Sequence, residues 1–272
     1  MGVFGTDSQE QHTEVQGVSE TLLEGRGVTK RFGGLTAVSS VDFTVRKGEI
    51  LGVIGPNGAG KTTLLNCITG LDPANEGEIL FHGERIETMK PHSITRMGVA
   101  RTFQIVQPFA GLAVRENVVM GALFGSQKSK KEVKRAQELA DEMLAFVGLS
   151  DKSAQLASQL TLAERKRLEF AKSLATEPEV LLLDEVNAGL NTTEIENAIS
   201  LIHKVREQGV TILVIEHLMK VITDLSDRVV VLHHGEKIAE GLPSEVTSDE
   251  QVIKAYLGEK YVAMMKKLAE ES

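Results

Sequence analysis

The chain has 272 residues, of which 42% are hydrophobic and 25% are charged, and its formal net charge is −8. This is the composition of an ordinary globular protein, so it excludes a disordered, collagen-like or disulfide-rich chain. The acidic balance, the aromatic content of 4% and the absence of tryptophan also argue against a general nucleic-acid-binding protein.

The cellular location is indicated by the single cysteine and by the apolar segments. Cys67 has no partner for an internal disulfide, which favours a reducing compartment. The longest apolar runs, such as 180–183 and 210–215, fall far short of the roughly 18 residues that span a bilayer. The first residues lack the apolar region of a secretory signal. We therefore expect a cytoplasmic protein that reaches a membrane only through a partner.

Strand-like and helix-like segments alternate along the chain after a polar, aperiodic stretch at 1–20, which we expect to be a mobile tail. Strands are expected at 41–45, 50–54, 180–184, 210–215 and 229–232. Helices are expected at 61–69, around 133–147, at 193–207 and at 218–224. The three later strands are nearly continuous in Val, Leu and Ile, which is typical of strands covered on both faces. The alternation predicts an α/β fold with a largely parallel sheet.

Residues 91–129 are less regular than the rest, with scattered Pro and Gly among short apolar patches. We interpret them as a boundary region that leads into a helical subdomain, whose helical pattern runs over about 114–177.

The strongest motif is Gly-Pro-Asn-Gly-Ala-Gly-Lys-Thr at 55–62, which fits the phosphate-binding pattern G-x-x-x-x-G-K-[ST] between a strand and a helix. Its glycines let backbone N–H groups point at phosphate oxygens, and the helix N-terminus adds partial positive charge. We expect Lys61 to reach the β- and γ-phosphates and Thr62 to ligate Mg²⁺. The alternative is a glycine-rich turn without a ligand. The candidate nucleotide-binding residues of this loop are Gly55, Asn57, Gly58, Ala59, Gly60, Lys61, Thr62 and Thr63.

Two acidic residues end the apolar run at 180–184. Asp184, at the carboxyl end of the strand, can hold the Mg²⁺ shell beside Thr62. Glu185 is placed to accept a proton from an attacking water. A charged turn after a buried strand is the alternative, but the preceding phosphate-binding motif favours the functional interpretation.

Three histidines follow buried strands. A neighbouring strand in the same sheet would put His217 near the γ-phosphate, although a lone histidine at a strand end is more often structural. The pair His233 and His234 resembles a metal site only superficially, since no other Cys or His cluster supports it. We interpret the pair as a solvated turn before Gly235.

Taken together, these motifs resemble the nucleotide-binding subunit of an ATP-binding cassette (ABC) transporter over about residues 22–258. Within that superfamily the chain is most similar to the ATP-binding subunits of branched-chain amino-acid importers. The closer match lies in Lys-Arg-Phe-Gly-Gly-Leu at 30–35, Ala-Arg-Thr-Phe-Gln at 100–104, Leu-Glu-Phe-Ala at 168–171, Ala-Gly-Leu-Asn at 188–191 and Val-Ile-Lys-Ala-Tyr-Leu-Gly at 252–258.

The resemblance implies an α/β P-loop NTPase fold of the ABC ATPase type. Its sheet core is mostly parallel, with an antiparallel β portion and an inserted helical subdomain at about 105–177. The ATPase domain is expected at 21–258, between a disordered tail at 1–20 and a C-terminal tail at 259–272.

The resemblance also implies roles for single residues. Phe32 aligns with the aromatic residue that stacks on adenine, a contact worth roughly 1–3 kcal/mol, with a core phenylalanine as the alternative. Val38 is a further implied nucleotide contact. Gln104 aligns with the glutamine that touches Mg²⁺ and the attacking water, and His217 with the switch histidine. The loop at 188–191 aligns with the loop that crosses the dimer interface.

The chain departs from the family at its signature, Leu-Ser-Gly-Gly-Gln, where residues 160–164 read Leu-Thr-Leu-Ala-Glu. Thr161 and Glu164 match a capping box, so we expect a helix N-terminus whose N–H groups and hydroxyl bind a γ-phosphate. A merely well-capped helix is the alternative. Ala163 adds a Cβ and Glu164 adds negative charge, which the basic residues 165–167 are expected to offset in part. We hypothesise that the half-site containing this signature turns over slowly.

The function implied is that of an ATPase that works as half of a dimer and energises an importer, most simply one for branched-chain amino acids. Its cofactors would be ATP and Mg²⁺, and its catalytic residues would be Glu185, His217, Gln104 and Lys61. The implied partners are two transmembrane permease subunits, a second ABC ATPase chain and, indirectly, a periplasmic substrate-binding protein, with no nucleic acid. The chain would lie on the inner face of the plasma membrane.

The permease contact is expected on the helical subdomain and around 104–117, where Phe109, Leu112 and Val114 are either exposed contacts or core residues. Other cargoes stay open, such as urea or amides in a related importer, or lipid in an exporter. A soluble cassette that acts in translation or DNA repair is disfavoured by the single P-loop, the lack of sustained heptads and the acidic charge.

Overall fold

The structure is a computed structural model that describes residues 20–102, 108–125 and 132–257. The tails predicted at 1–20 and 259–272 fall outside these residues, except for Glu20. Within the described residues, no helix is both long and apolar enough to cross a bilayer.

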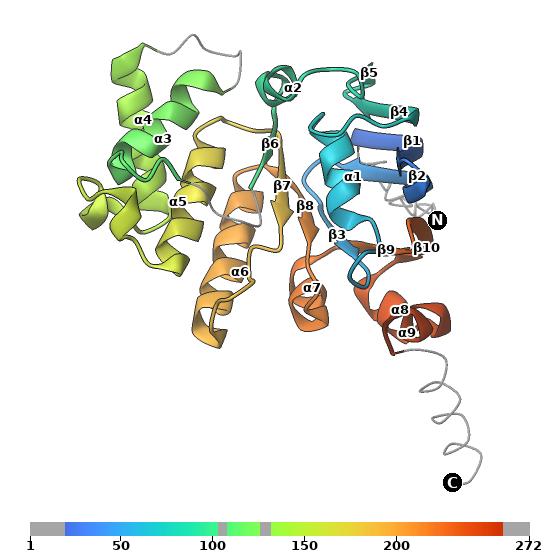
Figure 1. The fold of residues 1–272 in the computed structure, drawn as a ribbon. Helices are drawn as coiled ribbons and strands as arrows, with labels where there is room; N and C mark the ends of the chain where they lie inside the picture. Colours follow the sequence, from blue (N-terminus) through green and yellow to red (C-terminus); the bar gives the residue numbers. More distant parts are fainter. Residues whose placement is uncertain (1–19, 103–107, 126–131, 258–272) are drawn as a thin grey trace, which may run out of the picture.

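Two sheets organise the chain (Figure 1). The antiparallel sheet has the order β2-β1-β4-β5, with bounds Leu35–Arg46, Thr21–Phe32, Glu76–Phe81 and Glu84–Arg85. The larger sheet has the order β10-β9-β3-β8-β7-β6, and its neighbours are parallel except for the antiparallel pair β10–β9. Its bounds, in that order, are Glu236–Gly241, Arg228–His233, Ile50–Ile54, Thr211–Ile215, Val180–Asp184 and Val99–Arg101.

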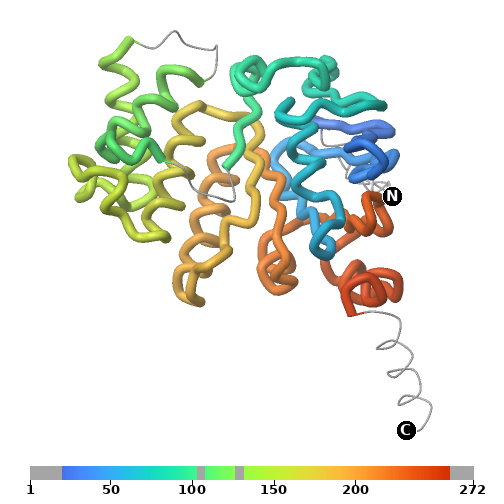
Figure 2. Tube along the Cα trace, viewed as in Figure 1, coloured from blue at the N-terminus to red at the C-terminus, as the bar shows by residue number. Residues whose placement is uncertain are grey.

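The helices fall into two groups, one around the parallel sheet and one at the end of that sheet, where α5 packs on β6. The first group is α1 (Lys61–Ile68), α2 (Pro91–Met97), α6 (Thr192–Glu207), α7 (Met219–Leu225), α8 (Pro243–Ser248) and α9 (Glu250–Leu257). The second group is α3 (Val114–Phe124), α4 (Val133–Phe146) and α5 (Leu162–Leu174), with short 3₁₀ turns at Ser150–Lys152 and Ala157–Gln159. Figures 1 and 2 show α3, α4 and α5 gathered at the opposite end of the molecule from the antiparallel sheet.

The central strands are buried on both faces because each face packs on a different layer. All five residues of β3, β7 and β8 are buried. Alternate residues belong to two hydrophobic clusters: Ile212 packs with residues of α5 and α6, and Leu213 packs with residues of α1 and the antiparallel sheet. This double burial explains why the strands are continuous apolar runs without alternation.

The mostly parallel α/β fold with an antiparallel portion, predicted from the sequence, is confirmed. The five predicted strands and four predicted helices are present, with ends that differ by one or two residues, and the strand at 41–45 is part of the longer β2. Residues 91–129, interpreted as a less regular boundary region, contain α2, β6 and all of α3. Of these, α3 lies within the helical pattern predicted from about 114, whereas α2 and β6 were not predicted. Strand β6 has only three residues and is ordered by its pairing with β7, so it carries little periodicity of its own. The boundaries of the helical subdomain stay predictions.

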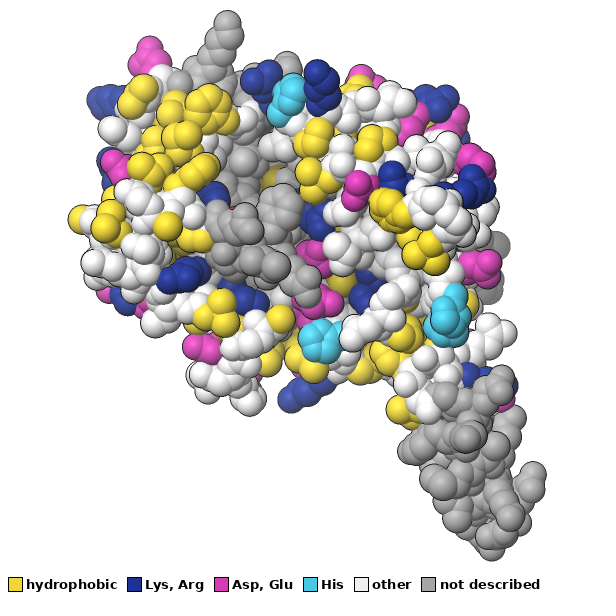
Figure 3. Space-filling view, viewed as in Figure 1, with side chains coloured by type: hydrophobic (Ala, Val, Ile, Leu, Met, Phe, Trp, Pro, Cys, Tyr) yellow, Lys and Arg dark blue, Asp and Glu magenta, His cyan; other side chains and the backbone are white. Residues whose placement is uncertain are grey.

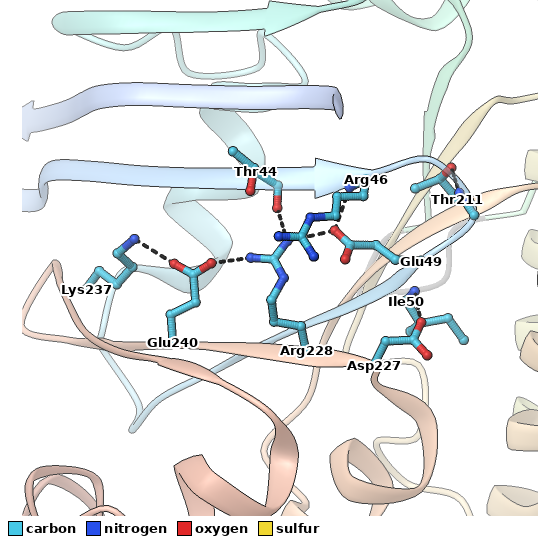
Figure 4. Close-up of polar contacts among 10 residues, drawn as sticks. Thr44, Arg46, Glu49, Ile50, Thr211, Asp227, Arg228, Lys237 and Glu240 are labelled. Carbon is cyan, nitrogen blue, oxygen red and sulfur yellow. Dashed lines mark hydrogen bonds and ion pairs between the residues drawn. The ribbon is translucent and has the colours of Figure 1, made fainter. Parts of the chain in front are cut away.

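One arginine ties the two sheets together (Figure 4). The guanidinium of Arg228, at the start of β9, donates to the carbonyl oxygen of Thr44 in β2 at 2.6 Å and to Oε1 of Glu49 at 2.8 Å. It also donates to Glu240 in β10. The next-door Asp227 accepts a hydrogen bond from the backbone N–H of Ile50 at 2.8 Å. The start of β3 is therefore tied to β2 of the antiparallel sheet and to β9 and β10 of the larger sheet.

We expect Arg228→Met to lower the free energy of unfolding by roughly 3 kcal/mol, because it removes the cation from a largely buried ion pair and leaves the carboxylate uncompensated. The side chains of Arg228 and Glu49 are 12% and 10% exposed. Urea denaturation measures the change. The control is Lys237→Met, which removes an exposed partner of Glu240 and should cost less than about 1 kcal/mol. Equal effects of the two substitutions would contradict the prediction.

Candidate functional site

The site lies where three parallel strands end at the same level. Val53 of β3 pairs with Ile215 of β8, and Ile215 pairs with Asp184 of β7. Since β8 lies between β3 and β7, the segments that follow all three strands leave the same edge of the sheet. Ligands of open α/β sheets bind in the crevice at such carboxyl ends.

Two glycines of the phosphate-binding loop are required by the local geometry. Gly55 has a φ of 153°, and a Cβ there would lie 2.1 Å from the carbonyl oxygen of Leu232. Gly60, the N-cap of α1, has a φ of 101°, and a Cβ there would lie 2.3 Å from the carbonyl oxygen of Ala37. Any side chain would displace the backbone at either position, so the loop can pass between β9 and β2 only with glycine there.

The loop lysine is folded back onto its own loop. Lys61 is 6% exposed, and its Nζ donates to the carbonyl oxygens of Gly55 at 2.7 Å and Pro56 at 3.0 Å. Burial lowers the pKa of Lys61, while the nearby carboxylates of Glu185 and Asp184 oppose that shift. The ammonium is thus held against its own loop, near Asp184 at the end of β7 and Glu185 directly after it.

The remaining residues of the loop differ in exposure. Asn57, Gly58 and Thr62 are exposed, Thr63 is half-buried and Ala59 is buried. The loop therefore presents backbone and the first turn of α1 to solvent, as a phosphate-binding loop must. The nucleotide contacts expected of these residues stay predictions.

Asp184 is almost fully buried, and its two oxygens differ. Oδ2 accepts a hydrogen bond from Arg101 at 2.7 Å, whereas Oδ1 is buried and accepts none from the residues that the structure describes. A carboxylate oxygen in this state suits a divalent cation, which takes oxygen ligands. No role was predicted for Arg101, whose partner Asp184 is 83 residues away in the chain.

Glu185 has an unusual backbone conformation. Its φ is 47°, in the left-handed region, and its backbone N–H donates to the carbonyl oxygen of Ile215 at 3.0 Å. Non-glycine residues adopt this conformation at a free-energy cost and are enriched at functional sites. The chain therefore leaves the extended conformation of β7 at Glu185, whose side chain is half-buried.

Behind Glu185 lies a buried pair that the sequence analysis did not identify. Glu216 is fully buried, and its Oε1 accepts hydrogen bonds from the backbone N–H of Asn187 at 3.1 Å and from Nδ2 of Asn187 at 2.8 Å. Burial raises the pKa of Glu216. The pair connects the end of β8 to the loop that follows Glu185. A glutamate directly after an apolar strand was its only sequence signal.

His217 follows Glu216 and faces outward. Its side chain is 45% exposed, and its Nδ1 lies 4.0 Å from Oε2 of Glu216. The rings of His233 and His234 have centroids 4.0 Å apart and are tilted by 49° to each other. His233 ends β9, and His234 is exposed in the turn before Gly235. Among the described residues there is no group of three His, Cys, Asp or Glu side chains that could hold a metal ion.

The aromatic residue expected to meet the nucleotide base is on the surface. Phe32, at the end of β1, is 46% exposed, and the Nζ of Lys30 lies 5.0 Å from its ring centroid. The alternative of a core phenylalanine is therefore wrong. Val38 is fully buried beneath the loop, with its Cγ2 beside Gly60, and its nucleotide contact stays a prediction. Gln104 lies outside the described residues.

The tip of α5 forms the capping box predicted from the sequence. The Oγ1 of Thr161 accepts from the backbone N–H of Glu164 at 3.3 Å, and Oε2 of Glu164 accepts from the backbone N–H of Thr161 at 2.9 Å. Glu164 also forms an ion pair with Lys152, which lowers the pKa of the glutamate.

The expected source of charge compensation at this tip is wrong. Arg165, Lys166 and Arg167 donate to backbone carbonyls of the segments around them, and Lys152 neutralises Glu164 instead. The three side chains reach three different segments, because successive helical positions do not share a face.

The tip of α5 and the phosphate-binding loop are separate in one chain. Thr161 and Ala163 border a cavity of about 570 Å³ between α4, α5 and α6, and no residue of the phosphate-binding loop lines it. The tip is tied to the sheet edge by Lys166, whose Nζ donates to the carbonyl oxygen of Val186 at 2.7 Å.

Family models match two parts of the chain. The model described as "ABC transporter" matches residues 38–188, and the model "Branched-chain amino acid ATP-binding cassette transporter" matches residues 236–262.

Curated relatives are similar over nearly the whole chain. The high-affinity branched-chain amino acid transport ATP-binding protein BraF of Pseudomonas aeruginosa is 39% identical over 254 residues, which are 89% of this chain and 100% of BraF. The protein of the same description, LivG, of Salmonella typhimurium is 40% identical with the same coverage.

Solved structures share the fold. The ADP conformation of MJ1267, an ATP-binding cassette of an ABC transporter, has a TM-score of 0.81 and 31% identity over 89% of this chain and 100% of that chain. The dimeric structure of MJ0796, a bacterial ABC transporter cassette, has a TM-score of 0.74 and 25% identity over 82% of this chain and 99% of that chain.

We expect Glu216→Gln to stabilise the protein relative to wild type as the pH rises above the ordinary glutamate value of 4.5. The folded state binds the Glu216 proton more tightly than the unfolded state, so the unfolded state binds fewer protons in this window and the wild type loses stability with rising pH. Glutamine removes this loss, and its Oε1 can still accept from Asn187. Denaturant unfolding of both proteins at pH 5 and pH 8 tests this; a stability difference that does not change with pH would contradict it.

Proposed function

This chain belongs to the ABC transporter family of ATP-binding cassettes, and from that premise we propose that it energises an importer of branched-chain amino acids on the inner face of the plasma membrane. It is an ATPase of the P-loop type. The cargo rests on the relatives BraF and LivG and on the match to the branched-chain model at 236–262. The observation that carries the ATPase is the strand register that brings the phosphate-binding loop and the two acids after β7 to one edge.

We propose Mg²⁺ as the metal partner of the nucleotide. Thr62 offers an exposed hydroxyl on the first turn of α1, and Asp184 offers the buried oxygen Oδ1. Both are ligand types that Mg²⁺ takes, and Gln104 is the third proposed ligand. When bound, the metal would supply positive charge that balances the phosphate oxygens.

The roles of the protein groups follow from chemistry and placement. Lys61 would exchange its two carbonyl acceptors for phosphate oxygens, which are stronger acceptors because they are charged. Glu185 would orient an attacking water and accept its proton, and exposed His217 would stabilise charge on the γ-phosphate. Phe32, the last residue of β1, would stack on adenine, since its ring is exposed and therefore available to a ligand.

The catalytic unit proposed is a dimer, because one chain keeps the tip of α5 apart from its own loop. A second ABC ATPase chain, identical or homologous, would bring its α5 tip to this chain's loop. The cassette MJ0796, whose solved structure is described as dimeric, supports a dimer. Thr161 and Ala163 would contribute the tip's contacts to nucleotide. The loop at 188–191 would meet the partner, and Leu162, 49% exposed, stands beside Gly189 there.

The proposed membrane partners are two permease subunits, with a periplasmic substrate-binding protein beyond them. Hydrophobic side chains gather over α3 and α4 (Figure 3), where Phe124 and Val133 are 65% and 59% exposed. Phe109 is 50% exposed and joins the proposed docking surface, and Leu112 is half-buried. Val114 is fully buried, so it is a core residue and not an exposed contact.

We expect Glu185→Gln to keep ATP binding, to slow hydrolysis by roughly 10²–10⁴-fold and to trap a closed dimer, because the general base is lost while the binding groups remain. Phosphate release and size-exclusion chromatography with ATP measure both effects. The control is Glu207→Gln, the same charge change at the exposed end of α6. If Glu185→Gln hydrolysed ATP at the wild-type rate, the assignment of Glu185 as the general base would be wrong.

We expect the composite site built on this chain's α5 tip to hydrolyse ATP about tenfold more slowly than a site built on a glycine-containing signature, a loss of about 1.4 kcal/mol of transition-state stabilisation. In a heterodimer, each P-loop lysine is replaced in turn and single-turnover hydrolysis is followed. Lys61→Ala leaves only the slow site. Equal rates from the two half-disabled dimers would end the hypothesis.

A further inference from the structure

The guanidinium of Arg101 forms a fork between two elements of the site. Its NH2 donates to Oδ2 of Asp184 at the end of β7, and its NH1 donates to Oδ1 of Asn66 on α1, each at 2.7 Å. The arginine side chain is 6% exposed and that of Asp184 is 1% exposed. The fork is therefore a buried contact that joins β6, through Arg101, to both β7 and α1.

Asn66 lies on the same face of α1 as Thr62, the residue proposed to bind the metal. Thr62 and Asn66 are four residues apart, so they lie on one helix face, one turn from each other. Nδ2 of Asn66 donates to Oδ2 of Asp72 at 2.8 Å, which fixes the amide so that its oxygen faces Arg101. The fork thus links the helix face of Thr62 to the carboxylate of Asp184.

The fork also decides which oxygen of Asp184 is available. Oδ2 is taken by Arg101, and Oδ1 is the buried oxygen that accepts no hydrogen bond from the described residues. A carboxylate held by one oxygen has a fixed plane, so its second oxygen has a fixed direction. Replacing a group that orients a metal ligand in this way typically lowers metal affinity by about 10–100-fold.

We propose that Arg101 is a positioning residue for the divalent cation: it holds Asp184 and the Thr62 face of α1 at a fixed offset and leaves Oδ1 of Asp184 to the metal. The inference rests on the proposed function, because it concerns the same nucleotide site. A lysine cannot replace the fork, since one ammonium does not reproduce the planar pair of donors that meets two acceptors on different elements.

The test is Arg101→Lys in the full-length chain, which keeps the charge and removes the fork. Binding of Mn²⁺ to the complex with a non-hydrolysable ATP analogue is measured by electron paramagnetic resonance, and binding of the same analogue in EDTA by fluorescence. We expect the Mn²⁺ affinity to fall about tenfold and the metal-free nucleotide affinity to stay unchanged. In ATPase assays the Mg²⁺ concentration for half-maximal rate should rise about tenfold, with less change in the rate at saturating Mg²⁺.

Two further variants calibrate the result. Asn66→Ala removes the α1 arm and keeps the Asp184 arm, so we expect a smaller loss of Mn²⁺ affinity in the same direction. Arg115→Lys is the matched control, because Arg115 also holds an aspartate, Asp141, through two N–H donors, but on α3 and α4. It should leave Mn²⁺ affinity at the wild-type value. Thermal unfolding of each variant checks that it is folded.

The outcomes separate this inference from the proposed function. If wild type binds Mn²⁺ with the nucleotide and Arg101→Lys binds it equally well or more tightly, the inference is wrong and the ATPase assignment stands. An equal fall of the metal-free nucleotide affinity would show a general structural role and would also overturn the inference. If wild type shows no metal-dependent nucleotide binding, both fail.

Discussion

The arrangement of the site depends on one constraint, the in-register pairing of β3, β8 and β7. Because Val53, Ile215 and Asp184 share one level, the phosphate-binding loop, Glu185 and His217 all leave the sheet along one edge. A slip of one residue would turn the apolar side chains of a strand to the opposite face, and both faces are packed. The hydrophobic core therefore specifies the position of the polar residues, although none of them belongs to it.

That edge concentrates negative charge, and the protein compensates it with specific partners. Asp184 is paired with Arg101, and Glu216 is held by two N–H groups of Asn187. Lys61 lies close enough to the acids of β7 for their charges to influence its protonation. Uncompensated buried carboxylates would be costly, so these partners make it possible to keep several acids at one strand edge. The arrangement links ligand chemistry to stability, since groups that serve the site also hold β6, α1 and the loop after β7.

The structural features that are confirmed are those encoded by neighbours in the chain. The glycine-rich loop between a strand and a helix, the acids at the end of an apolar strand and the capping box at Thr161 each lie within a few residues, so local pattern is sufficient to place them. The ligand contacts of these residues stay predictions. The roles of Arg101 and Glu216 were not predicted, because their partners are 83 and 29 residues away. The compensation of Glu164 was misassigned for the same reason, since Lys152 belongs to another turn. Strand β6 was missed because its pairing, and not its three residues, orders it.

The two carbonyl contacts of Lys61 restrict where its ammonium can lie. Nζ donates to two backbone oxygens of the same loop, so the long side chain is held against that loop and does not extend freely into solvent. A donor that is already ordered loses less conformational entropy when it engages a ligand. The short reach of these two contacts, which join residues five and six positions apart, therefore lowers the entropic cost of any anion that the loop binds.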